Sequence, residues 1–253
     1  MFSSASMGRR SVATALIALL AWAASPPANA DESSARVVGS GTVRSEPRAV
    51  SGFRAIALNG SIKLVLRQGS REGIELRADD NVLPLIETRV VDRDGMRTLE
   101  IGPKRGAYYE SRNPVVATVD LITLGALTVA GAGDVVSDAL KTPALKVAIT
   151  GSGDLKLRGL AADEISAQVS GSGDLEFSGR THKLGVSIAG SGDVNTRGLD
   201  ADDVSVSVAG SGDAKVTARK TLAVSIAGSG NVVYAGDAVV KSSIAGHGSV
   251  TKQ

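Results

Sequence analysis

The sequence predicts an all-β protein whose regular part is a single-stranded, right-handed parallel β-helix, or β-solenoid, with coils of about 18–20 residues. Two observations carry this prediction. A phrase made of an aliphatic residue, a small residue and Gly-x-Gly, usually followed by Asp, recurs seven times in the second half of the chain. Between the copies, apolar and polar residues alternate with a period of two, which is the period of a strand. Each coil of such a repeat buries its apolar face by stacking on its neighbours.

The glycines of the phrase are interpreted as corners, because Gly adopts positive φ without the steric cost that other residues incur. The first glycines of successive copies are 20, 20, 19, 20, 18 and 18 residues apart. The predicted structural corners are Gly131, Gly133, Gly151, Gly153, Gly171, Gly173, Gly190, Gly192, Gly210, Gly212, Gly228, Gly230, Gly246 and Gly248. We assign them a role in turning the chain and no part in chemistry.

One coil shows the pattern in detail. Val204, Val206 and Val208 share one face, and the serines between them share the other. The alternation resumes after Gly-Ser-Gly-Asp with Ala214 and Val216. In five coils a second break follows eight residues after the first glycine, at Gly159, Gly179, Gly198, Ala218 and Gly236. We therefore predict two short strands and two corners in each coil.

Residues 1–30 are predicted to be a cleaved signal peptide. Arg9 and Arg10 precede a short apolar stretch, and Ala28-Asn-Ala30 forms an A-x-A cleavage signal. The apolar stretch is too short to span a bilayer. We therefore expect no transmembrane segment after signal cleavage, and a location in the periplasm or outside the cell.

The rest of the chain is expected to divide at two points. Residues 31–50 form a polar lead-in, and residues 51–253 form one solenoid domain. Within that domain, we expect irregular coils over residues 51–125 and regular Gly-x-Gly-Asp coils over residues 126–253.

Four local patterns can be assigned within the irregular part. Residues 53–66 alternate on both sides of Asn59-Gly60, which predicts a strand, a turn and a second strand. Residues 92–95 have the composition of a hairpin turn. Residues 81–87 suggest one short helical turn, and residues 103–114 are predicted to be a loop.

Composition narrows the classes of function. Removing Arg9 and Arg10 with the signal peptide leaves 26 basic residues against 26 acidic ones. Such a neutral, interspersed surface argues against nucleic acid as a partner. The only Trp, Trp22, is removed as well, and a sugar-processing groove usually has aromatic side chains, of which few remain. We therefore predict no enzyme and no cofactor, with a polysaccharide-acting β-helix enzyme as the lesser alternative.

The residue that follows each Gly-x-Gly forms a column of its own. In chain order these residues are Asp134, Asp154, Asp174, Asp193, Asp213, Asn231 and Ser249. Stacked carboxylates repel one another, so either bound cations relieve the charge or each Asp caps its corner through backbone N–H groups. Calcium-binding solenoids use a nine-residue repeat with Gly-Gly-x-Gly-x-Asp, which this chain lacks. We favour corner capping, and a calcium- or cation-binding solenoid is the alternative.

Three other features are candidate sites: His182, His247 and the Tyr108-Tyr109 pair. His182 and His247 have no second ligand at metal spacing, so both are predicted to be surface residues and no metal site is expected. Tyr108-Tyr109 stands near Arg105 and Arg112, a combination that is favoured at interfaces. A loop that covers an open end of the solenoid is the preferred interpretation of this segment.

The repeat and two motifs that precede it resemble a known family. The motifs are Gly39-Ser-Gly41 with Pro47–Gly60, and Asp79-Asp-Asn81 with the apolar residues up to Ile86. Together with the array they resemble the putative auto-transporter adhesin head GIN domain family over residues 38–253. The resemblance implies a single-stranded parallel β-helix in an exported bacterial protein of unassigned function. It implies no catalytic residues.

These observations lead to one expectation about function. We expect an exported, non-enzymatic structural or interaction module of the bacterial envelope, of which an adhesin is one form. Its partner would be an unidentified protein or glycan of the envelope. The final coil, residues 243–251, leaves unpaired strand edges, which favours an end-to-end homodimer unless the lead-in or the loop near Tyr108 covers an end.

Overall fold

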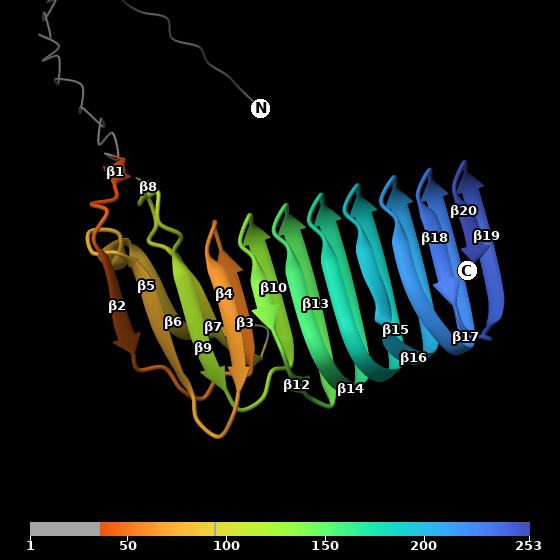
Figure 1. Cartoon of the computed structure of the whole chain (residues 1–253), viewed down its shortest axis with the longest axis horizontal. Helices are drawn as coiled ribbons and strands as arrows, with labels where there is room; N and C mark the ends of the chain where they lie inside the picture. The colour runs from red at the N-terminus through yellow and green to blue at the C-terminus, as the bar shows by residue number, and fades with distance from the viewer. Residues whose placement is uncertain (1–35, 94) are drawn as a thin grey trace, which may run out of the picture. The chain divides into compact units, whose positions relative to one another are not determined.

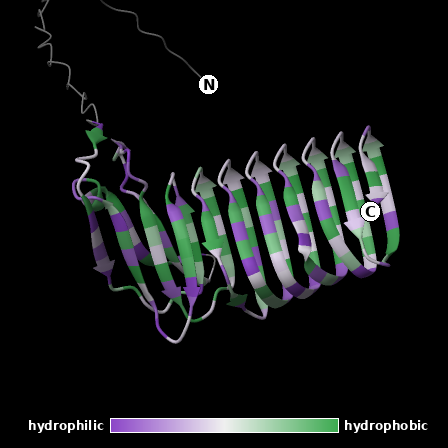
Figure 2. Ribbon diagram, in the orientation of Figure 1, coloured by the Kyte–Doolittle hydropathy of each residue, from purple (hydrophilic) through white to green (hydrophobic). Residues whose placement is uncertain are grey.

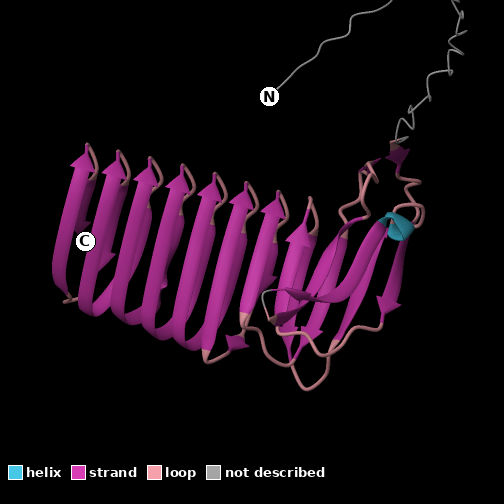
Figure 3. Cartoon of the chain, turned by 180° about the vertical axis from the view of Figure 1, so that it is seen from behind, coloured by secondary structure: helices cyan, strands magenta, loops and turns pink. Residues whose placement is uncertain are grey.

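The computed structural model describes residues 36–93 and 95–253, which form β-strands and one turn of 3-10 helix (Figures 1 and 3). The predicted signal peptide, the first five residues of the lead-in and Asp94 lie outside the described residues. Among the described residues, no helix has the length and apolarity that a membrane crossing requires.

The first part of the domain mixes parallel and antiparallel strands. Its elements are β1 (Val37–Val38), β2 (Val43–Arg48), β3 (Ala55–Asn59), β4 (Lys63–Gln68), β5 (Gly73–Asp79), the 3-10 turn η1 (Leu83–Leu85), β6 (Ile86–Arg93), β7 (Met96–Pro103), β8 (Tyr109–Glu110) and β9 (Val116–Leu121). The expected helical turn is therefore present as η1. The predicted hairpin is also present, because β6 and β7 pair antiparallel with Arg93 opposite Met96.

The second part is the regular stack. Its strands are β10 (Ala126–Gly131), β11 (Val135–Ser137), β12 (Leu140–Lys141), β13 (Ala144–Gly151), β14 (Leu155–Gly171), β15 (Leu175–Gly190), β16 (Val194–Gly210), β17 (Ala214–Gly228), β18 (Asn231–Ala235), β19 (Val239–Gly246) and β20 (Ser249–Lys252). Their pairing with one another is parallel throughout, from coil to coil, and equivalent positions of the repeat stand opposite one another along most of each coil. The predicted all-β solenoid is confirmed.

The internal structure of each coil differs from the prediction of two short strands. In the middle of the stack, β14, β15, β16 and β17 are single strands of 15–17 residues that continue through the second break. The break is a bend with a small irregularity in register, as between Leu157 and Leu160. Pairing with the neighbouring coils is interrupted for a few residues at the bend, as between Thr196 and Asp200 of β16, and resumes beyond it, so the chain changes direction there within one strand. The strands themselves end only at the Gly-x-Gly-Asp corner.

The predicted loop at residues 103–114 also contains more structure than expected. Its β8 pairs parallel with β1 as a separate two-stranded sheet. Sequence reasoning missed this pair because two-residue strands carry no periodicity.

Antiparallel strands close the first end of the stack. β5 pairs with β2 on one side and with β9 on the other, and β6 pairs with β7. The sheet closes around this end except for a gap that Arg48 bridges. From the end of β2, its guanidinium donates hydrogen bonds to the carbonyl oxygens of Ile86 (2.6 Å) and Leu83 (3.0 Å), and it also pairs with Glu46. The Arg48 side chain thus bonds to backbone carbonyls where, elsewhere in the sheet, the backbone N–H groups of a neighbouring strand would do so.

Hydrophobic residues at equivalent positions form bands that cross the strands along the stack (Figure 2). Their aliphatic side chains form the core. One column contains Val129, Ile149, Val169, Ile188, Val208, Ile226 and Ile244. The first six are at most 1% exposed, because each is covered by a neighbour on both sides. Ile244 lies in the last coil described and is 42% exposed. Burial of this kind provides most of the stability of such a stack.

This column gives a first prediction. Replacing Ile188 with Ala leaves a cavity between two tightly packed coils and should lower the free energy of unfolding by about 2–5 kcal/mol. Urea denaturation followed by circular dichroism measures the change. The control is Ser187→Ala on the outward face of the same strand, which should cost less than about 0.5 kcal/mol. Equal losses in the two variants would contradict the packing described here.

Candidate functional site

The corner glycines are required for two separate reasons. The first glycine of each pair has positive φ, as at Gly171 with φ of 128°. The second glycine needs space: a Cβ built on Gly173 would overlap the carbonyl oxygen of Gly153 in the preceding coil. The N–H groups of Ser172 and Gly173 both point at the carbonyl of Gly151, at 2.9 and 3.2 Å. Sequence reasoning anticipated the conformation, whereas the close approach of neighbouring backbones becomes visible only in the stack.

The Asp column forms a hydrogen-bonded ladder at these corners. Oδ1 of Asp154 accepts the backbone N–H of Asp174 (3.2 Å), and Oδ1 of Asp174 accepts that of Asp193 (3.1 Å). The ladder begins at Asp134 and continues through Asp193 and Asp213. At its far end Asn231 donates its amide to Asp213 and accepts the hydroxyl of Ser249. One oxygen of each carboxylate is thus used to fasten the next coil.

This ladder bears on the cation-binding alternative. Among the described residues, no three His, Cys, Asp or Glu side chains are grouped closely enough to hold a metal ion. The carboxylates are spread along the stack, one per coil, instead of converging on a point. Each carboxylate accepts a backbone N–H from the next coil, where local capping of its own corner was expected, and these contacts offset part of the negative charge.

A hollow lies at the other turn of the coils, where β14, β15 and β16 bend. We define it as the bend groove; it has a volume of about 720 Å³, and its lining includes Lys141, Ala161, Arg180, Asp200 and Arg219. Each of these residues comes from a different coil. The sequence prediction did not single out this groove, although the coil period alone places these positions side by side.

Charges alternate from coil to coil along the bend. The coil with Asp163 and Glu164 is acidic, the next is basic, the third is acidic and the fourth is basic. The basic and acidic residues that follow are Arg180, His182 and Lys183, then Asp200, Asp202 and Asp203, then Arg219 and Lys220. In-register stacking would otherwise place like charges about 5 Å apart, so the alternation converts repulsion into attraction.

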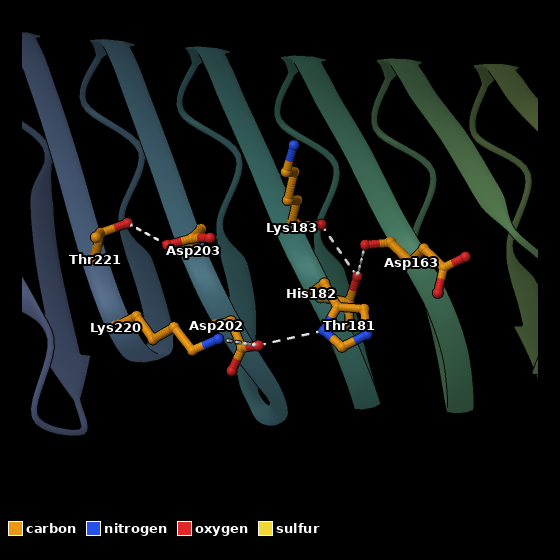
Figure 4. A network of polar contacts seen from close by, with 8 residues as sticks. All are labelled: Asp163, Thr181, His182, Lys183, Asp202, Asp203, Lys220 and Thr221. Carbon is orange, nitrogen blue, oxygen red and sulfur yellow. Dashed lines mark hydrogen bonds and ion pairs between the residues drawn. The ribbon is translucent and has the colours of Figure 1, made fainter.

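Asp202 is the centre of the best-defined contacts on the bend (Figure 4). Its Oδ2 accepts a hydrogen bond from Lys220 (3.0 Å) and lies 3.2 Å from Nδ1 of His182. The hydrogen bond from Lys220, followed by that from His182, lowers the pKa of Asp202 below its ordinary value. His182 therefore lies on the surface, as predicted, but with an acidic partner one coil away. The signal was present in the sequence, since residues 182, 202 and 220 are separated by the coil steps of 20 and 18.

A third candidate segment is the loop with Tyr108 and Tyr109. One buried carboxylate attaches this loop to the antiparallel strands at the first end of the stack. Asp79, at the end of β5, is 1% exposed and accepts hydrogen bonds from Ser111 Oγ and Asn113 Nδ2, both at 2.7 Å. These two hydrogen bonds, aided by one from the backbone of Gly41, lower the pKa of Asp79. Tyr108 is 63% exposed, whereas Tyr109 is half-buried and has its pKa raised by burial.

Further hydrogen bonds in this region explain why the Gly39-Ser-Gly41 and Asp79-Asp-Asn81 motifs occur together. The side chain of Asn81 accepts the N–H of Ser40 (2.9 Å) and donates to the carbonyl of Val38 (2.8 Å). Asp80 accepts the hydroxyl of Ser40. The Gly39-Ser-Gly41 and Asp79-Asp-Asn81 motifs therefore bind each other, a contact that sequence reasoning did not anticipate.

Other candidate residues remain separate from these sites. His247 lies exposed in the last corner, and its backbone N–H bonds to Gly228. Arg105 and Arg112 are exposed on the loop near Tyr108. The outward face of the long strands carries a column of small and polar side chains: Thr128, Ala148, Gln168, Ser187, Ser207, Ser225 and Ser243.

These features define a class of protein: a parallel β-solenoid closed at one end by an antiparallel cap, with polar ladders along its surface. The model of the family described as "Putative auto-transporter adhesin, head GIN domain" matches residues 52–238. The chain belongs to this family, as the sequence resemblance implied. No curated protein matches the chain.

Solved structures show the same fold. A putative adhesin from Bacteroides fragilis NCTC 9343 is 22% identical, with a TM-score of 0.80 over 86% of this chain and 100% of that one. A putative adhesin from Parabacteroides distasonis ATCC 8503 is 25% identical, with a TM-score of 0.68 over 87% and 100% of the two chains. A putative lipid binding protein from the same organism is 23% identical, with a TM-score of 0.69 over the same shares.

The corner geometry leads to a second prediction. Gly173→Ala should destabilise the protein by more than about 1 kcal/mol, because the new methyl group meets a backbone carbonyl that cannot move without displacing a coil. Thermal unfolding measures the loss. Ser172→Ala, at the exposed position between the two glycines, is the matched control and should unfold like the wild type. An alanine at Gly173 that proved as harmless as the control would show that the coils are spaced more widely.

The contacts of Asp202 lead to a third prediction. Because Lys220 is the main cause of its lowered pKa, Lys220→Met should raise the pKa of Asp202 toward its ordinary value. A carboxylate with a lowered pKa adds stability above its unfolded pKa, and this contribution disappears as the pH falls through the folded pKa. NMR titration of the side-chain carboxyl carbon measures the shift. Lys215→Met, on another part of the surface, should leave the titration of Asp202 unchanged.

Proposed function

We propose that this protein is an exported, non-enzymatic interaction module of the bacterial envelope. It adheres to an envelope partner through the rows of polar side chains on its surface. One observation supports this proposal above all: the chemically capable side chains are arranged in rows, one per coil. Rows suit the binding of an extended partner. Catalysis instead requires a nucleophile, a base and a charge-stabilising group that converge within about 3 Å of one reacting atom.

The contacts around His182 illustrate the difference. His182 and Asp202 form the pair that often orients a catalytic base, but the neighbouring hydroxyl is already engaged. Thr181 Oγ lies 3.1 Å from the carbonyl oxygen of Lys183 and 3.3 Å from that of Asp163, so its proton is donated to the backbone (Figure 4). Asp202 itself is shared with Lys220. These side chains therefore hold neighbouring coils together at the bend.

The place of the protein in the cell is part of the proposal. The basic pair, the apolar stretch and the A-x-A signal within residues 1–30 support export. Membership in a family described as an auto-transporter adhesin head agrees with export. Mass spectrometry of the protein recovered from periplasm and culture medium should find a new N-terminus at residue 31.

Binding to isolated Gram-negative envelopes tests the adhesive function. The purified protein should sediment with envelopes in a saturable manner and compete with its own unlabelled form, while a panel of glycans should show no turnover. The heat-unfolded protein is the control for nonspecific adsorption. Absence of saturable binding would contradict an adhesive role. A reproducible hydrolase or lyase rate that one carboxylate substitution abolishes would overturn the non-enzymatic one.

A further inference from the structure

Three cations of the bend groove repeat at a spacing of two coils. Lys141, Arg180 and Arg219 are each 39 residues apart, and all three line the same hollow. Coils stack about 4.8 Å apart, so cations on every second coil are about 10 Å apart. The groove therefore has a regular charge pattern along the axis of the stack.

The positions between these cations are small or acidic. Ala161 stands in register with Lys141 on one side and with Arg180 on the other. Asp200 stands in register with Arg180 and pairs with Arg219 at 3.5 Å. Ala161 and Ala162 are half-buried in the lining of the groove, whereas Lys141 and Arg180 are exposed. A ligand group can therefore reach the space between Lys141 and Arg180.

The first two cations are available to a ligand. Within residues 36–93 and 95–253, the side chains of Lys141 and Arg180 form no ion pair with an acidic residue, whereas Arg219 and Lys220 are paired with Asp200 and Asp202. Exposed cations in a groove gain charge-assisted hydrogen bonds when an anionic group binds. The carboxylates of Asp163 and Asp200 accept hydrogen bonds, which suits hydroxyl groups on the same ligand.

From this pattern we propose that the bend groove binds an acidic polysaccharide that runs along the stack and carries one carboxylate on every second sugar. Two successive carboxylates of the ligand pair with Lys141 and Arg180, the neutral sugar between them lies over Ala161, and its hydroxyls donate to the neighbouring Asp side chains. The proposal rests on the proposed adhesive function and specifies the class of partner.

The charge density of the groove separates this ligand from nucleic acid. A nucleic acid strand carries a negative charge every ~3.4 Å, so some of its phosphates would meet Asp163 and Asp200. A polysaccharide with sparse charge and hydroxyls between the charges avoids this repulsion. The groove is balanced in sign and regular in spacing, which favours a neutral stretch between two anions.

The test compares three polysaccharides in a direct binding assay with the purified protein. Hyaluronan has one carboxylate per disaccharide, polygalacturonate has one per sugar, and dextran is neutral. We expect hyaluronan to bind more tightly than either of the others, with an affinity that falls as salt is raised. Equal binding of dextran and hyaluronan, or no binding of hyaluronan, would overturn the proposal, as would preferential binding of single-stranded poly(A).

Variants at Ala161 separate charge from shape. Ala161→Glu places a carboxylate between the two cations, where it attracts them itself and repels the ligand's carboxylates, and should weaken hyaluronan binding at least about ten-fold. Ala161→Gln has the same size without the charge and should weaken it clearly less. Equal effects of the two substitutions would contradict the assigned contact. Circular dichroism and the melting temperature show that both variants are folded.

A second pair of variants guards against a folding defect at Ala161. Lys141→Ala with Arg180→Ala should reduce hyaluronan binding at least about ten-fold, whereas Lys156→Ala with Lys215→Ala removes the same charge from the Asp corner and should change it less than two-fold. Similar losses in the two double variants would overturn the assignment to the bend groove.

Envelope sedimentation distinguishes the two proposals. If the Ala161→Glu variant loses hyaluronan but still binds envelopes, the groove assignment holds and adhesion uses a further surface. If the wild type binds envelopes but not hyaluronan, the groove proposal fails and the adhesive function stands. If it binds neither, both fail.

Discussion

Everything in this structure depends on how closely neighbouring backbones approach at the Gly-x-Gly corners. At Gly171 and Gly173 the chain passes so near the preceding coil that a side chain would meet the carbonyl oxygens of Gly151 and Gly153, respectively. The N–H groups at this corner bond to the carbonyl of Gly151. The corners hold successive coils in register. Once they do, equivalent positions of the repeat stand beside one another along most of each coil. Glycine at these sites therefore determines the surface as well as the turn.

Exact register benefits apolar residues and creates a difficulty for charged ones. In the core, aliphatic columns such as that of Ile188 cover one another on both sides. On the surface, the same stacking brings like charges together, and the protein resolves this in two ways. At the corner each Asp receives a backbone N–H from the next coil. At the bend the sign of the charge changes from one coil to the next, and Asp202 is held between His182 and Lys220.

The sequence was sufficient for the features that repeat and insufficient for those that occur once. The coil period predicts the solenoid, its corners and the alternation of core and surface, because each is specified several times over. It does not reveal that strands such as β14 continue through the bend, since Gly159 has the composition of a break while backbone pairing depends on the neighbouring coils. The hydrogen bonds of Arg48 across the gap in the sheet, and those of Asp79 with the loop near Tyr108, were also not predicted. Each joins residues more than thirty positions apart and occurs only once, so no periodicity marks them.

The alternation of charge at the bend also constrains how such a protein can change in length. A repeat grows in evolution by duplication of whole coils. An extra single coil beside Arg180 or Asp200 would bring two coils of the same sign together, whereas an inserted pair would preserve the order. The Asp corner imposes no such parity, because each of its coils supplies the same acceptor and the same N–H. The contacts at the corner would therefore tolerate the insertion of one coil. The alternation of charge at the bend requires that coils be inserted in pairs.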